Sequence, residues 1–115
     1  MTVQEIVDAL QLNVLNAADL SREIRDGYAS DLLSCVMAGA KAGDVWVTLQ
    51  AHPNVIAVAL LLELSAVIIT EDVTPDEETM RKARLESVNL LTATRDTFSV
   101  VSELAALGIK GAKAD

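Results

Sequence analysis

The sequence has few of the residues on which catalytic and metal sites depend. It contains one histidine and one cysteine, and it has no glycine-rich loop of the kind that binds phosphates or dinucleotides. A structural zinc site needs four ligands of these types, so one histidine and one cysteine are too few. The chain also offers no recognisable nucleophile motif. We therefore expect a protein that is not an enzyme and that holds no metal and no cofactor.

A single cysteine excludes an internal disulfide. Cys35 stands between Leu32 and Val36 in a helical pattern, which predicts a small buried hydrophobic residue. The alternative is a reactive thiol, and it stays open at this point.

Positive charge is scarce. The chain carries 9 Lys and Arg residues against 17 Asp and Glu residues, and its formal net charge is -8. Long-range electrostatics then repel phosphate backbones and anionic membranes. We expect no nucleic acid and no membrane among the partners.

Long hydrophobic runs and targeting signals are also lacking. The longest apolar stretch, residues 55–62, is far shorter than the roughly 20 residues that cross a bilayer. The first ten residues contain Glu5 and Asp8 and have no basic region, which argues against a secretory signal. These observations predict a cytoplasmic protein.

Aromatic residues make up only 3% of a sequence that is 51% hydrophobic. The core must therefore consist of aliphatic residues, which suit parallel strands that are buried on both faces. A chain of 115 residues has the size of one domain. We place that domain at residues 1–109 and expect a flexible tail at residues 110–115.

Short apolar runs alternate with helical patterns along the chain. Strands are expected at residues 14–15, 45–49, 66–70 and 88–91, with a turn or short strand at 24–29. Such alternation predicts an α/β fold, namely a single three-layer domain with a mostly parallel sheet of four to five short strands and about five flanking helices. Trp46 belongs to a strand pattern, so we expect it in the core with its indole hydrogen-bonded.

Capping residues predict where the helices begin. Thr2 with Glu5 fits a capping box, and His52 precedes a proline suited to the first helical position. Ser30 or Asp31 is expected to cap a helix that buries Leu32, Leu33, Val36, Met37 and Ala40 and ends at Gly43. Two later helices are expected to begin at Thr74 with Pro75 and at Thr94, and the last one to bury Phe98, Val101, Leu104 and Ala105.

Four polar turns, at residues 28–31, 49–54, 70–72 and 92–94, each follow an apolar run and precede a helical pattern. In a parallel sheet these turns meet at the carboxyl edge, where such folds bind ligands. Gln50, His52 and Asn54 cluster there at a helix N-terminus, which favours an anion such as a carboxylate or phosphate. The alternative is that His52 and Asn54 brace only their own corner.

A second polar cluster contains Arg22, Asp26, Ser30 and Asp31. Arg22 suits a bidentate contact with an anion, and the alternative is an ion pair with Asp19 or Asp26. Tyr28 follows Gly27, at a place where a ligand or a second subunit could approach.

The helix expected at residues 54–64 is apolar on nearly every side, and Glu63 is its only charge. A helix of this kind must be covered on more than one face. It lies either deep in the domain or at a subunit interface.

Residues 20–34 and 43–54 resemble the DRTGG domain family, and the resemblance runs from about residue 3 to residue 109. Arg22 and Gly27 match the namesake motif. Ser21 stands in place of its aspartate, and the stretch from Arg25 to Gly27 replaces its threonine and paired glycines.

The resemblance implies an α/β module related to the N-terminal domain of HPr kinase/phosphorylase and to a domain of some Mur ligases. Members of this family occur alone, beside phosphate acetyltransferase domains, and between CBS domains in regulated pyrophosphatases. The resemblance therefore implies a regulatory or dimerising role with no catalytic activity to carry over.

Three functions follow in order of preference. The first is a non-catalytic regulatory or scaffolding module that forms a homodimer and serves a larger enzyme system. The second is a sensor of a nucleotide or another small anion at the carboxyl edge of the sheet. The third is an enzyme with His52 as general base. The residues assigned to a ligand site are Arg22, Gly27, Tyr28, Ser30, Gln50, His52, Asn54 and Thr70.

Overall fold

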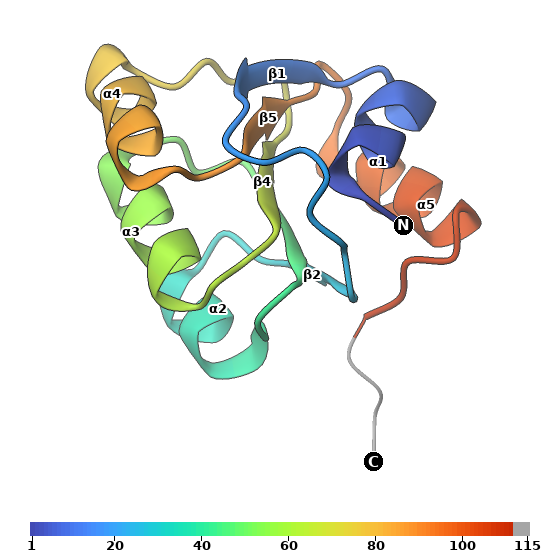
Figure 1. Cartoon of the computed structure of the whole chain (residues 1–115). Coiled ribbons are helices and arrows are strands. Elements are labelled where there is room, and N and C mark those ends of the chain that lie inside the picture. The colour runs from blue at the N-terminus through green and yellow to red at the C-terminus, as the bar shows by residue number, and fades with distance from the viewer. Residues whose placement is uncertain (112–115) are drawn as a thin grey trace.

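The computed structural model describes residues 1–111 of the chain, which form five helices and five strands (Figure 1). The helices are α1 (Val3–Leu10), α2 (Leu33–Gly39), α3 (Pro53–Leu61), α4 (Glu77–Glu86) and α5 (Thr97–Ala106). The strands are β1 (Asn13–Asn16), β2 (Gly27–Ala29), β3 (Val45–Thr48), β4 (Ala66–Ile69) and β5 (Leu90–Thr92). Strands and helices alternate from β2 onward, as the sequence predicts.

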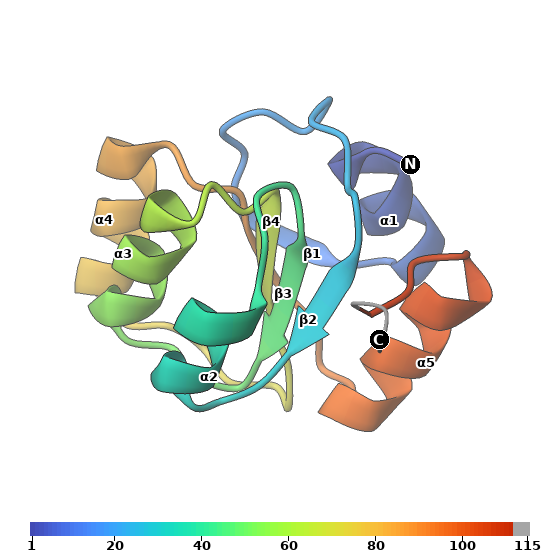
Figure 2. The ribbon, with the colours of Figure 1, turned by 90° about the horizontal axis from the view of Figure 1, so that it is seen from below.

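The strands form one sheet in the order β1-β5-β4-β3-β2. β2, β3, β4 and β5 are parallel, and only β1 is antiparallel to its neighbour. Helices α2, α3 and α4 cover one face of the sheet, and α1 and α5 cover the other (Figure 2). The predicted three-layer α/β fold with a mostly parallel sheet is confirmed.

Every residue of the central strands β3 and β4 is buried. Trp46 in β3 is fully buried, and its Nε1 donates a hydrogen bond to the Ser30 carbonyl oxygen at 2.9 Å. The prediction for this indole is confirmed. Two aliphatic clusters result, one on each face of the sheet, because alternate side chains of a strand point to opposite faces.

Two of the predicted helix starts are confirmed. Thr2 caps α1, since its Oγ1 accepts from the Glu5 N–H at 3.2 Å and the Glu5 carboxylate accepts from the Thr2 N–H at 3.0 Å. His52 is the N-cap residue of α3, and Pro53 takes the first helical position. Both predictions rest on local chemistry that needs no tertiary contact.

Two other predicted starts are wrong by two residues. Asp76, not Thr74, is the N-cap of α4, and its carboxylate accepts from the Thr79 N–H at 2.8 Å. Asp96, not Thr94, is the N-cap of α5. Each turn contains several residues of the capping type, and the aspartate directly before the helix takes the N-cap position. The Asp76 carboxylate accepts a cap hydrogen bond, whereas the Asp96 carboxylate makes none within the described structure.

The predictions for α2 are wrong in part. Leu32 is its N-cap, with no side-chain cap bond, and Ser30 and Asp31 bond elsewhere. Val36 and Ala40 are buried and Leu33 is half-buried, but Leu32, Met37 and Cys35 are exposed. This short helix covers the edge strand β2, so only one narrow side of it meets the sheet. Gly43 adopts φ +87° in the turn after α2, whose C-cap is Ala40.

The apolar side predicted for α5 is also displaced. Val100 and Leu104 face the core, whereas Phe98 is 80% exposed and Val101 is exposed at the helix flank. Ala105 is exposed as well. The flank of α5 that carries Phe98, Val101 and Ala105 therefore stays uncovered within the described part of the chain.

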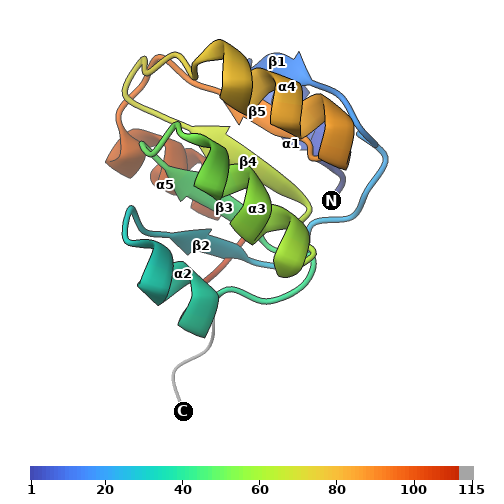
Figure 3. The same ribbon diagram turned by 90° about the vertical axis from the view of Figure 1, so that its left-hand side faces the viewer.

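Helix α3 lies between α2 and α4 in its layer (Figure 3). It buries Val55, Ile56 and Ala59 against the sheet. Leu60 and Leu61 face outward and are 47% and 65% exposed. The helix is thus a covered element on one side and an apolar surface on the other.

The C-terminal segment contacts the start of β2. Ile109 is buried, and the Lys110 carbonyl oxygen accepts a hydrogen bond from the Gly27 N–H at 2.8 Å. The predicted tail at residues 110–115 therefore begins with an ordered contact. Its remaining part, residues 112–115, lies outside the described residues.

Candidate functional site

The carboxyl edge of the sheet brings together several of the predicted ligand-site residues, and Ser30 and Gln50 bond to neighbouring residues of the same turns. Asp31 accepts from the Thr48 hydroxyl at 2.9 Å and from the Leu49 N–H at 2.8 Å. Gln50 Nε2 donates to the Asp31 carbonyl oxygen at 3.1 Å, and Ser30 Oγ accepts from the Leu32 N–H at 3.2 Å. This corner holds the ends of β2 and β3 together.

Thr70 joins the end of β4 to the start of α5. It is fully buried, and its hydroxyl lies 2.6 Å from the Thr97 hydroxyl. Glu71 accepts from the Thr97 N–H at 2.8 Å. Glu71 and Asp72 both have left-handed backbone conformations, with φ of 64° and 59°. The Thr70 hydroxyl is therefore already engaged by a hydrogen bond within the fold.

His52 and Asn54 stand at the N-terminus of α3. The His52 side chain makes no cap hydrogen bond in the described structure, and Asn54 is exposed. The neighbouring α4 begins at Asp76, whose pKa is lowered by the hydrogen bond from the Thr79 N–H and, to a smaller degree, by His52. An anion at this helix end would meet the Asn54 N–H and also a nearby carboxylate, because Pro53 has no N–H and the Val55 N–H donates to the His52 carbonyl oxygen at 3.0 Å.

Arg22 lies at the opposite, amino edge of the sheet. Its guanidinium donates to the carbonyl oxygens of Leu64, at 3.0 Å, and Glu63. The predicted ion pair with Asp19 or Asp26 is not formed within residues 1–111. Arg22 instead binds the carbonyls that follow the C-terminus of α3, where a cation is favoured by the helix dipole. The structure does not bring Arg22 to the carboxyl-edge cluster.

Asn89 is the central polar residue of the amino edge, and sequence analysis missed it. Its Oδ1 accepts from the N–H groups of Ala18 and Asp19, both at 2.9 Å. Its Nδ2 donates to the carbonyl oxygens of Asp19 at 2.7 Å and Ser65 at 3.0 Å. No periodic pattern marks such a residue, because its role depends on a loop about 70 positions away.

Tyr28 fastens α2 to the edge strand β2. Its hydroxyl donates to the Cys35 carbonyl oxygen at 3.0 Å. Its ring packs on Gly39, where the β-carbon of any other residue would lie only 2.6 Å from a ring carbon. A larger residue at position 39 would therefore require the Tyr28 ring to move, so Tyr28 has a structural contact on the α2 face.

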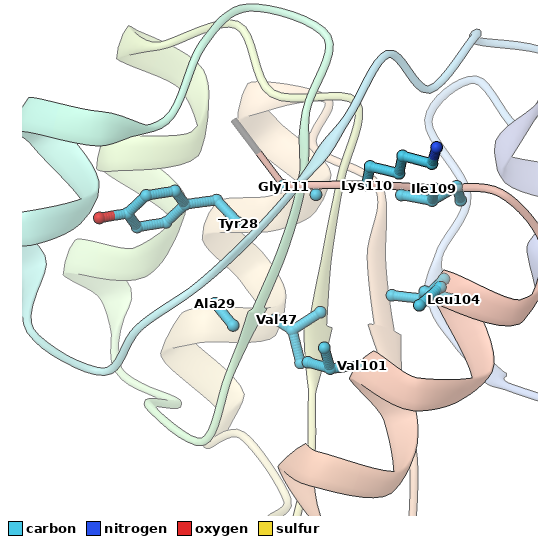
Figure 4. A pocket seen from close by; sticks show the side chains of 10 residues that line it. Tyr28, Ala29, Val47, Val101, Leu104, Ile109, Lys110 and Gly111 are labelled. Atoms are coloured by element: carbon cyan, nitrogen blue, oxygen red, sulfur yellow. The ribbon is translucent and has the colours of Figure 1, made fainter. Parts of the chain in front are cut away.

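A cavity of about 450 Å³ lies on the other face of β2, between that strand, β3 and α5 (Figure 4). Ala29, Val47 and Val101 point toward it, and the Tyr28 ring points away from it. The complete lining is Gly27, Tyr28, Ala29, Val47, Val101, Leu104, Ala105, Ile109, Lys110 and Gly111. Of the predicted site residues, only Gly27 and Tyr28 contribute. The signal in the sequence that could have indicated this cavity is the pair of small residues, Gly27 and Ala29, at alternate positions of β2.

The described residues hold no group of three or more histidine, cysteine or carboxylate side chains arranged to bind a metal ion. Within residues 1–111, no helix has the length and apolar character that spanning a membrane requires.

The model of the family described as DRTGG domain matches residues 5–107, so the chain belongs to this family. No curated protein sequence matches the chain. Among solved structures, the chain is similar to the CBS and DRTGG domains of the regulatory region of Clostridium perfringens pyrophosphatase, in complex with the activator diadenosine tetraphosphate.

That similarity has a TM-score of 0.74 at 17% sequence identity, and it covers 90% of this chain and 45% of the other. The likeness shows the fold. The chain spans less than half the length of that neighbour.

Proposed function

We propose that this DRTGG domain is a non-catalytic regulatory module that forms a homodimer through the outer face of α3. The Clostridium perfringens neighbour combines a DRTGG domain with CBS domains in a regulatory region, which supports a regulatory role. The domain passes a signal by its association and leaves catalysis to a larger enzyme system.

The observation that carries the proposal is the composition of α3. The nine residues of this helix include no charged side chain, yet Leu60 and Leu61 are largely exposed. Burying exposed apolar surface contributes about 25 cal/mol for each Å² removed from water. Two copies that pack these helices face to face, related by a twofold axis, cover the leucines without burying a charge of α3.

The test compares the mass in solution of the wild type with that of two variants, Leu61→Glu in α3 and Leu85→Glu in α4. Leu85 is 69% exposed and provides a matched control outside α3. We expect a dimer for the wild type and Leu85→Glu, and a folded monomer for Leu61→Glu. A monomeric wild type contradicts the proposal, as does a Leu61→Glu variant that stays folded and dimeric.

A second candidate is a sensor of a small anion, such as a nucleotide, at the N-terminus of α3. The N-terminus of α3 beside His52 favours it, because the Asn54 N–H there can donate a hydrogen bond to an anion. This candidate ranks second because hydrogen bonds within the fold already engage Ser30, Gln50 and Thr70. Titration with ATP, followed by amide NMR in the wild type and His52→Ala, tests it. Saturable shifts near His52 that the variant loses support it, and unchanged spectra contradict it.

A further inference from the structure

The outer edge of β2 has an arrangement that suits an added strand. β2 is the last strand of the sheet, and it pairs with β3 through alternate residues, as parallel strands do. The Asp26 carbonyl oxygen accepts from the Val45 N–H at 2.9 Å, and the Ser30 N–H donates to the Val47 carbonyl oxygen at 3.3 Å. By this alternation, the backbone groups of Gly27 and Ala29 point away from β3.

The chain itself already uses the first of these groups. The Gly27 N–H donates to the Lys110 carbonyl oxygen, so an extended backbone fits against this edge. A β-carbon on Gly27 would lie 3.3 Å from the Ile109 side chain, a close contact that glycine avoids. Within residues 1–111, no other backbone group bonds the outward N–H and carbonyl of Ala29, which is exposed.

The cavity of about 450 Å³ lies directly beside this edge. Its side-chain lining is apolar apart from Lys110, and Val101 at its rim is 38% exposed. Strand-addition sites combine main-chain hydrogen bonds, which give affinity, with pockets for alternate side chains, which give specificity. The β2 edge supplies the first and the cavity supplies the second.

We propose that the β2 edge binds an extended peptide segment of a partner protein, which adds a strand to the sheet and inserts one large apolar side chain into the cavity. The charges near β2 indicate which residues should flank that apolar side chain in the peptide. Asp26 and Asp31 stand at the two ends of β2 in a chain of net charge -8. A segment with a basic residue on each side complements these ends.

The proposed site lies on the opposite face of the sheet from α3, so it is independent of the proposed self-association. Val101, Leu104 and Ala105 come from α5, which covers the other face (Figure 2). The Leu61→Glu variant is predicted to keep peptide binding, and loss of peptide binding leaves the mass in solution unchanged. Failure of one proposal is therefore distinguishable from failure of the other.

The test uses the blocked peptide acetyl-Lys-Thr-Leu-Thr-Val-Lys-amide, titrated into the full chain and followed by amide NMR. We expect saturable shifts at Gly27, Ala29 and Val101 with a Kd on the order of 1 mM or tighter. The same peptide with Asp in place of Leu should bind at least tenfold more weakly. Absence of saturable shifts, or equal binding of both peptides, overturns the proposal.

Two variants separate the edge from the cavity. Ala29→Pro removes the outward N–H and keeps the pairing with β3, because proline is tolerated at outward-facing edge positions. Val101→Glu places a charge at the cavity rim. Each should weaken binding at least tenfold, whereas Leu85→Glu on the other face should leave it unchanged. Binding that survives both variants overturns the proposal. The proposal is also overturned if a shortened chain that ends at Gly111 binds the peptide and the full chain does not, because the site is then occupied in the full chain.

Discussion

At the scale of single residues, a buried polar side chain connects segments that lie far apart in the sequence. Asn89 is only 4% exposed, and its oxygen accepts from backbone N–H groups of the loop after β1. Its nitrogen donates to a carbonyl oxygen of that loop and to the carbonyl oxygen of the residue before β4. An amide side chain has two donors and an acceptor oxygen, so it matches this set of partners. An aspartate or a leucine at this position lacks the donors.

The first prediction concerns this residue. Asn89→Ala leaves buried backbone donors and acceptors unpaired, so we expect the free energy of unfolding to fall by about 2 to 4 kcal/mol. Urea unfolding measures it. Asn13→Ala, at an exposed asparagine of β1, is the control and should change stability by less than about 0.5 kcal/mol. Equal effects of the two substitutions would contradict the assigned role of Asn89.

Acid sensitivity also originates in particular carboxylates at helix starts. Hydrogen bonds from the Thr2 N–H, the Thr79 N–H and the Ser99 hydroxyl lower the pKa values of Glu5, Asp76 and Asp96, respectively. A carboxylate whose pKa is lower in the folded than in the unfolded chain stabilises the fold fully above the unfolded value. That stabilisation is lost as the pH falls through the folded pKa.

The second prediction follows from this sign. The melting temperature should fall as the pH is lowered from about 5 to about 2, because this range spans the ordinary carboxyl pKa of about 4. Asp76→Asn keeps a capping side chain that does not titrate, so its melting temperature should fall less steeply over this range. Asp8→Asn removes the same charge from a position that caps no helix. Circular dichroism measures all three proteins, and identical acid profiles for wild type and Asp76→Asn would refute the assignment.

At the scale of elements, local patterns predicted what depends on neighbours in sequence. The capping box at Thr2 and the proline start of α3 follow from local bonding, and the buried strands β3 and β4 follow from aliphatic runs. The burial of Cys35 and Phe98 was predicted wrongly, because both helices lie near the β2 edge and have one uncovered flank. Periodicity identifies an apolar side but not how much of it the sheet covers.

The predicted site residues also divide into those whose positions follow from local pattern and strand order and those whose positions do not. The meeting of Ser30, Gln50 and Thr70 at the carboxyl edge follows from parallel strand order alone, and the structure brings these turns together. Arg22 sits in an irregular loop, whose direction no periodicity records, and it lies at the other edge. The cavity beside β2 needs α5 and the C-terminal segment in place, so only the tertiary structure reveals it.

At the scale of the whole molecule, net charge opposes self-association. Each copy carries a formal charge of -8, so two copies repel one another over distances that salt shortens. The proposed contact at α3 contributes no charge of its own to offset this repulsion.

The third prediction is therefore a salt effect of definite sign. Raising the ionic strength from about 0.02 M to about 0.3 M should tighten the dimer several-fold, because screening reduces the repulsion while the apolar contact remains. Sedimentation at several protein concentrations measures the dissociation constant. A dimer that weakens with salt would instead indicate ion pairs across the interface.

The central claim is that α3 mediates self-association, and a dilution series followed by amide NMR tests it most directly. We expect concentration-dependent shifts to gather at the outward residues of α3, Leu60 and Leu61, and to spare the exposed Gln4 of α1. Spectra that do not change with concentration, or changes confined to β2 and α5, would contradict it.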